Sequence, residues 1–131
     1  MTYKAYVFVN SKVCGNQTGI QAAHAIARLV HKRSYRVSSW MANETLVLLN
    51  GGTDKRMHEI LNILIDKSSA EHVATFREPD MGGLLTAVAY IPSDAEDFMA
   101  REIRAGVGQH DINVPSAAIA NLIATTHTHR G

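Results

Sequence analysis

Apolar residues are arranged along this chain in two ways, as short unbroken runs and as longer stretches with helical spacing. Four short runs, each bounded by turn-forming residues, predict strands at residues 4–10, 45–49, 72–77 and 85–91. Three longer stretches predict helices at residues 18–31, 54–67 and 95–105, the second with its N-cap at Thr53 or Asp54. The order β-α-β-α-β-β-α predicts an α/β fold, a single-domain three-layer-type sandwich whose small, mixed, four-stranded sheet is flanked by helices.

Two connecting segments have a distinct composition. Residues 32–43 are rich in basic side chains and contain the only tryptophan, Trp40, and we expect a basic loop there. Residues 78–83 (EPDMGG) combine proline, aspartate and glycine, which is typical of a turn. This turn would join the last two predicted strands as a hairpin.

The chain is predicted to divide near residue 105. Residues 1–105 hold the predicted α/β domain, and residues 106–131 form a C-terminal extension. Residues 115–126 of the extension have a helical pattern, and we expect them to cover a neighbouring element or a second subunit. The end of the chain, residues 125–131, is expected to be frayed.

Composition narrows the class of protein. With 131 residues, 46% of them hydrophobic and 19% charged, the chain suits one soluble globular domain. No apolar run approaches the roughly 18 residues of a membrane span, and the N-terminal residues lack a signal-peptide pattern. A single cysteine, Cys14, excludes an internal disulfide. We therefore expect a cytoplasmic protein, in a cell or in an infected host, without membrane contact.

Polar residues form one line along the first predicted helix. Gln17, Gln21, His24, Arg28 and His31 are separated by 4, 3, 4 and 3 positions. At about 3.6 residues per turn, they lie within about 40° of a common direction. The other residues of this helix are mostly alanine, isoleucine, leucine and valine, so most of its surface is expected to be buried. The polar line is then either the solvated edge of the helix or the floor of a site.

Two motifs give the chain a resemblance to a known family. The first is GNQTGIQAAHA at residues 15–25, directly after the first strand, and the second is EPDMGGLLTAVA at residues 78–89. Together they resemble the archaeal and eukaryotic type of peptidyl-tRNA hydrolase, in particular a small divergent branch found in bacteria and phages. The resemblance extends over about residues 4–104. The matching positions are Gln21, Ala22, Ala23, His24 and Ala25, then Asp80, Gly82, Gly83, Thr86 and Val88.

The chain departs from the family at one important position. The lysine to which the family's catalysis is usually assigned is replaced by Gln17. The loop that carries Asp80 is also shorter than in the family. Lys12 is the nearest cation in sequence and could reach the same site. The resemblance therefore implies the fold more strongly than it implies hydrolysis.

The resemblance implies hydrolysis of the ester between a peptide and a tRNA 3′ end, without cofactor or metal. Such a reaction needs an activated water and stabilisation of an oxyanion. His24 would act as general base and Asp80 would orient the imidazole or the water. Gln17 and Gln21 would donate amide hydrogens to the oxyanion or to the terminal ribose. Lys12 or Arg28 would supply positive charge.

Basic and polar residues near these motifs are candidates for substrate binding. Lys32, Arg33 and Arg36 would hold the tRNA backbone, and Tyr35 or Trp40 would stack a base. The predicted substrate-binding set is completed by Asn10, Arg28 and Thr86.

Other interpretations of the same residues stay open. The polar line, His24, the basic segment and the EPDMGG turn each have a purely structural explanation. A non-catalytic protein on this scaffold would hold tRNA, another RNA or a small nucleotide, for example as a phage sequestering protein. In a third interpretation the apolar segment 117–124 drives homo-oligomerisation and the chain is a scaffold.

Overall fold

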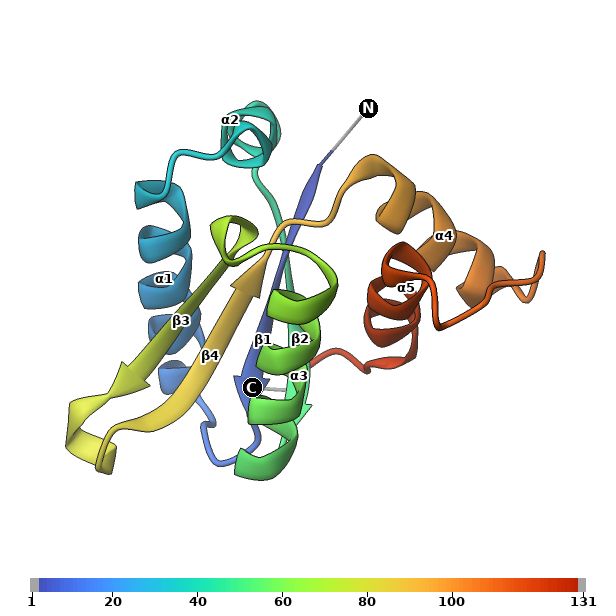
Figure 1. Cartoon of the computed structure of the whole chain (residues 1–131). Coiled ribbons are helices and arrows are strands. Elements are labelled where there is room, and N and C mark those ends of the chain that lie inside the picture. The colour runs from blue at the N-terminus through green and yellow to red at the C-terminus, as the bar shows by residue number, and fades with distance from the viewer. Residues whose placement is uncertain (1–2, 130–131) are drawn as a thin grey trace.

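The computed structural model describes residues 3–129 and contains one mixed sheet with helices on both faces (Figure 1). The strands are β1 (Lys4–Asn10), β2 (Thr45–Gly52), β3 (Val73–Glu78) and β4 (Leu84–Tyr90), in the order β2-β1-β4-β3. β1 is parallel to β2 and antiparallel to β4, and β3 and β4 form an antiparallel hairpin. The predicted α/β class, the mixed four-stranded sheet and the order of the predicted elements are confirmed.

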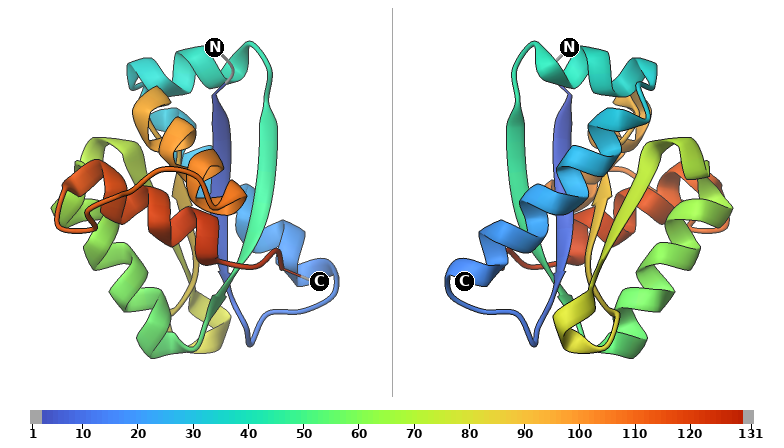
Figure 2. Two further views of the ribbon diagram at one scale, coloured as in Figure 1. Left: turned by 90° about the vertical axis from the view of Figure 1, so that its right-hand side faces the viewer. Right: turned by 90° about the vertical axis from the view of Figure 1, so that its left-hand side faces the viewer.

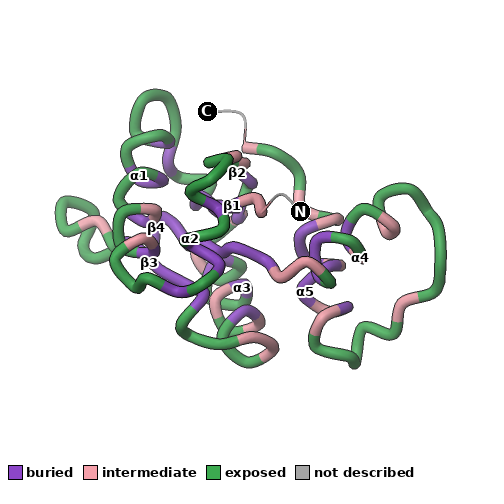
Figure 3. Tube along the Cα trace, turned by 90° about the horizontal axis from the view of Figure 1, so that it is seen from above, coloured by how far each residue is buried: buried purple, intermediate pink, exposed green. Residues whose placement is uncertain are grey.

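Within the described residues, five α-helices surround this sheet. They are α1 (Asn16–His31), α2 (Tyr35–Met41), α3 (Asp54–Lys67), α4 (Asp94–Ala105) and α5 (Pro115–Thr125). α1 and α2 cover one face, and α3 covers the other together with α4 and α5, as the two side views show (Figure 2). Seen from above, the α4–α5 pair stands beside α3 (Figure 3), and its buried apolar residues belong to the same core cluster as those of α3.

The two faces of the sheet differ in side-chain size. Toward α1 the strands present mainly alanine and valine, such as Ala87 and Ala89, whereas toward α3 they present larger residues such as Tyr6 and Phe8. This division follows from the two-residue period of a strand. Small residues on both α1 and the sheet allow α1 to approach closely, which positions its polar residues near β4.

The segment predicted to be a basic loop instead contains α2. The Ser34 hydroxyl accepts a hydrogen bond from Val37 N and caps the helix, while Val37 and Trp40 bury its inner side. Arg33, with φ 56°, lies in the left-handed region at the bend between α1 and α2. The capping serine and the spacing of Val37 and Trp40 carried a helical signal, which the high density of basic residues obscured.

The C-terminal segment belongs to the core. α5 packs against α3 and α4, and Ile119 and Ile123 are completely buried, so the predicted helix does cover neighbouring elements. Residues 127–129, expected to be frayed, instead pair with β2: Asn50 N donates to His127 O, and His129 N donates to Leu48 O. The free edge of β2 offers these backbone partners, which the sequence pattern does not reveal. Residues 130–131 lie outside the described range.

No helix in the described part of the chain is both long enough and apolar enough to cross a membrane.

The burial of α5 predicts a large effect of truncating its inner side chains. Replacing Ile119 with alanine should lower the free energy of unfolding by about 2–5 kcal/mol, because a buried cavity is left behind. Ile112→Ala is the matched control, since Ile112 is 59% exposed, and it should change stability by no more than about 0.5 kcal/mol. Urea denaturation of both variants measures the difference, and similar values for the two would contradict this placement of α5.

Candidate functional site

Gln21 is the centre of a hydrogen-bonded group between α1 and the β3–β4 hairpin. The Thr86 hydroxyl donates to Gln21 Oε1 at 2.6 Å, and Gln21 Nε2 donates to Glu78 Oε2 at 2.8 Å. The same amide nitrogen lies 3.3 Å from Gln17 Oε1. Gln21 is 1% exposed and uses both ends of its amide. We call Gln17, Gln21, Glu78 and Thr86 the polar cluster.

An irregularity in the hairpin presents Thr86 to α1. The pairing of β3 with β4 shifts between Phe76 and Arg77, because Phe76 lies opposite Ala87 whereas Arg77 lies opposite Leu85. Thr86 is therefore an extra residue, a β-bulge, and such bulges redirect side chains out of the regular alternation. Its hydroxyl also lies 3.3 Å from the Phe76 carbonyl oxygen.

Glu78 is the acidic member of the site, and the sequence analysis did not single it out. Its Oε1 accepts a hydrogen bond from Asp80 N at 3.2 Å, while Oε2 accepts from Gln21. Asp80 joins the site through its backbone, and among the described residues its carboxylate has no hydrogen bond to His24. The predicted role of Asp80 beside His24 is therefore not supported by a contact. Glu78 ends β3 directly before proline, and this position was its only signal in the sequence.

His24 lies flat on an aromatic ring beside the polar cluster. Its imidazole stacks on Phe76 with ring centroids 4.3 Å apart and an angle of 13° between the planes. Arg28 lies over the same ring, 5.2 Å from its centroid. His24 and Arg28 are exposed, as is Gln17, whereas Gln21 is buried. The polar line along α1 is thus a solvated edge over most of its length, with one member built into the interior.

The surroundings of Glu78 favour its charged form. The hydrogen bond from Gln21 lowers the pKa of Glu78 most, and the Asp80 N–H and the nearby His24 lower it further. Glu78 is therefore a carboxylate at neutral pH.

Lys12 and Asn10 belong to a different contact. Lys12 Nζ forms an ion pair with Asp54 at 3.0 Å, and Asn10 Nδ2 donates to the other Asp54 oxygen at 2.6 Å. Hydrogen bonds from Asn10 and Lys12 lower the pKa of Asp54. Asp54 is the first residue of α3, so this ion pair ties Lys12 to α3, and within residues 3–129 no hydrogen bond or ion pair joins Lys12 to the polar cluster. The predicted replacement of the family's lysine by Lys12 is not supported, and Asn10 is a buried link between β1 and α3.

Lys32, Arg33 and Arg36, which were predicted to hold the tRNA backbone together, do not all lie at the surface. Arg36 is 8% exposed and donates from Nη1 to Tyr90 Oη at 3.1 Å and to the Ile91 carbonyl oxygen at 3.0 Å. It also lies 3.7 Å from Glu96, so its charge is neutralised inside the protein and does not reach a surface ligand. Lys32 and Arg33 are exposed, but Trp40 is buried and cannot stack with a base.

The arrangement offers an anion, an imidazole and amide groups within one small area. Gln17 is exposed, and its amide nitrogen Nε2 donates no hydrogen bond within residues 3–129, whereas the amide nitrogen of Gln21 does. No group of three or more histidine, cysteine, aspartate or glutamate side chains in the described part of the chain is placed to hold a metal ion. The cluster is suited to binding a polar ligand and to transferring a proton through His24.

The bridge between Thr86 and Gln21 predicts a stability effect. Thr86→Val keeps the shape of the side chain but leaves buried Gln21 Oε1 without a donor, which should cost about 1–3 kcal/mol. Thr75→Val on the neighbouring strand is the control, because Thr75 is partly exposed and the described residues give its hydroxyl no partner. Guanidinium unfolding measures both, and equal losses would show that the bridge contributes nothing specific.

The lowered pKa of Glu78 predicts how its contribution depends on pH. The carboxylate stabilises the fold above its unfolded pKa of about 4.5, and this contribution is lost as pH falls through the lower folded value. The stability difference between the unaltered protein and Glu78→Gln should therefore be constant near neutrality and shrink below about pH 4.5. Unfolding curves recorded between neutral and acid pH measure it, and a difference that grows on acidification would reverse the assigned sign.

No protein-family model matches this chain, and no curated protein matches it. What the polar cluster binds is therefore inferred from its own donors, acceptors and stacked rings.

Proposed function

We propose that this protein hydrolyses the ester between a blocked amino acid or peptide and the 3′ end of tRNA. The observation that carries the proposal is the chain Thr86–Gln21–Glu78, which holds a carboxylate next to exposed His24. The order of these residues along α1 and the hairpin agrees with the two motifs that resemble the peptidyl-tRNA hydrolase family. Such a substrate places the protein in the cytoplasm.

Each residue of the site has a role in this reaction. His24 accepts a proton from water, which then attacks the ester carbonyl, and Glu78 stabilises the imidazolium that results. Gln17 donates an amide hydrogen to the developing oxyanion. Gln21 is a positioning residue, because its own donors and acceptor are already used within the fold. Arg28 contributes positive charge beside the site, and exposed Arg33 contacts the tRNA backbone.

A second function, binding of an RNA 3′ end without turnover, is favoured by one specific observation. The polar cluster contains no ammonium group, because Gln17 occupies the position of the family's lysine and Lys12 is paired with Asp54 at the start of α3. Loss of this charge weakens stabilisation of an oxyanion. Gln17, His24 and Arg28 still offer donors and a flat ring to a nucleotide.

The first experiment measures release of the blocked amino acid from N-acetylated aminoacyl-tRNA by the purified protein. The unaltered protein should release it, and His24→Ala should be slower by a factor of about a hundred or more. His58→Ala is the matched control, since His58 is an exposed histidine on α3, on the opposite face of the sheet. It should keep full activity.

The outcomes separate the two functions. Release that is unaffected by His24→Ala would contradict the assigned base. No release, combined with salt-sensitive retention of the tRNA, would support binding without turnover. In that case Gln17→Lys should introduce or raise hydrolysis, because it restores a cation next to Gln21.

A further inference from the structure

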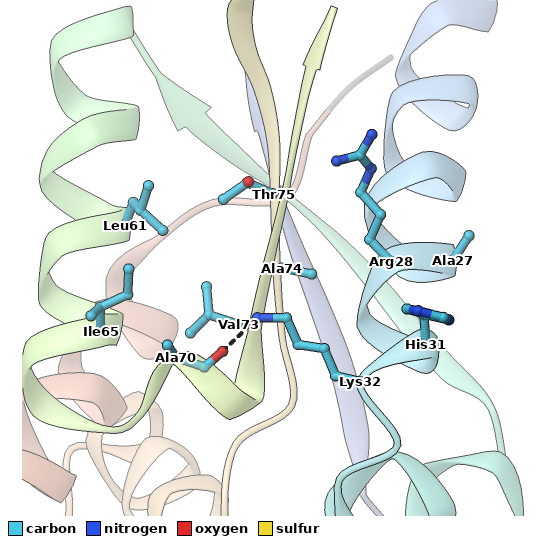
Figure 4. Close-up of a pocket in the computed structure, with 10 residues that line it drawn as sticks. All are labelled: Ala27, Arg28, His31, Lys32, Leu61, Ile65, Ala70, Val73, Ala74 and Thr75. Carbon is cyan, nitrogen blue, oxygen red and sulfur yellow. Dashed lines mark hydrogen bonds between the residues drawn. The ribbon is translucent and has the colours of Figure 1, made fainter.

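A groove runs along the free edge of the sheet, apart from the polar cluster. It has a volume of about 700 Å³ and lies between α1 and α3, with β3 and the short helical turn Ala70–His72 forming its floor (Figure 4). α1 contributes Arg28 and Lys32 to its lining, α3 contributes Leu61 and Ile65, and β3 contributes Val73 and Thr75.

The floor of this groove is an unpaired strand edge. β3 is the last strand in the order β2-β1-β4-β3, and within residues 3–129 it pairs with β4 alone. Every second backbone N–H and C=O group of such a strand faces away from its partner and is free to pair with another chain. An extended peptide can therefore add to β3 as a fifth strand.

The two walls of the groove differ in chemistry. α3 contributes aliphatic Leu61 and Ile65, the latter 44% exposed, while α1 contributes two cations, Arg28 and Lys32, with His31 between them. Figure 4 shows Lys32 reaching across to the Ala70 carbonyl oxygen, a contact of 2.7 Å. Among the described residues, none that lines the groove is acidic. The groove thus has an apolar side and a positively charged side.

The geometry points to an extended peptide of alternating apolar and acidic residues as the ligand of this groove. Successive side chains of an added strand point to opposite faces of the sheet. One set would then contact Leu61 and Ile65, and the other set would meet Arg28 and Lys32. Main-chain hydrogen bonds to β3 give affinity, and the alternation of charge and apolar character gives specificity. This assignment is independent of ester hydrolysis.

Two other occupants fit the groove less well. Pairing of β3 with β3 of a second copy, around a two-fold axis perpendicular to the sheet, brings the two α1 helices to the same face. Arg28 and Lys32 would then face their own copies, and like charges repel. A single-stranded RNA would pair with the cations, but it would leave Leu61, Ile65 and the β3 backbone edge without partners, and the lining contains no Phe, Tyr or Trp on which a base could stack.

The test uses a capped, fluorescent peptide of alternating valine and glutamate, six residues long like β3. Fluorescence anisotropy should show binding that weakens with added salt. The same peptide with lysine in place of glutamate should not bind, nor should one whose backbone nitrogens are methylated. Lys32→Glu and Ile65→Glu should each weaken binding about tenfold or more. Lys55→Glu, the same change of charge at an exposed α3 residue outside the groove, should not.

Nuclear magnetic resonance locates the peptide. Amide shifts concentrated at residues 73–75 support strand addition to β3. Equal affinity for the lysine peptide, absence of binding, or shifts elsewhere would overturn the proposal. Displacement of the peptide by oligouridylate with the same amide shifts would identify the groove as a nucleic-acid surface. Ester release from tRNA is measured in a separate experiment, so neither its presence nor its absence affects the outcome of the peptide-binding test.

Discussion

The full hydrogen bonding of Gln21 is the constraint on which the arrangement of α1 and the β3–β4 hairpin depends. A buried amide without partners costs several kcal/mol, so a glutamine at this position requires an acceptor and a donor at fixed places. Thr86 supplies the donor and Glu78 the acceptor. Displacement of α1 along the sheet would break both bonds. The same two contacts hold Glu78 beside His24, so the fold and the candidate chemistry depend on one side chain.

A second buried network fixes the opposite end of the sheet. Arg36 on α2 bonds to Tyr90 at the end of β4, and Tyr90 donates to Glu96 on α4 at 2.6 Å. Burial, and then the charge of Glu96, raise the pKa of Tyr90, so its hydroxyl stays a neutral donor. Glu96 also accepts from Ser93 N within a capping box. These bonds tie α2 to α4 across the end of the sheet and explain why Arg36 is not available at the surface.

The candidate hydrolytic site and the peptide groove occupy adjoining parts of one surface. Arg28 lies over the ring of Phe76, on which His24 also stacks, and Arg28 lines the groove as well. The two regions nevertheless depend on different interactions. At the polar cluster, buried amide hydrogen bonds fix a charge beside an imidazole. In the groove, a ligand is selected by its extended backbone, which pairs with β3. It is also selected by the alternation of apolar and acidic side chains, which matches the different walls formed by α1 and α3.

The chain's pattern of apolar residues determined the class of fold, because burial of strands and helix faces imposes periods that are visible in one dimension. The two motifs that carry the family resemblance singled out Gln21, His24 and Thr86 as candidate site residues. What it did not determine were contacts between residues far apart in sequence. Glu78 beside Gln21, Lys12 beside Asp54 and Arg36 beneath Tyr90 follow from how the elements pack, and residues 127–129 pair with β2 only because its edge is free. Charge and hydrogen-bonding type are properties of a residue, whereas its partner is chosen by tertiary structure.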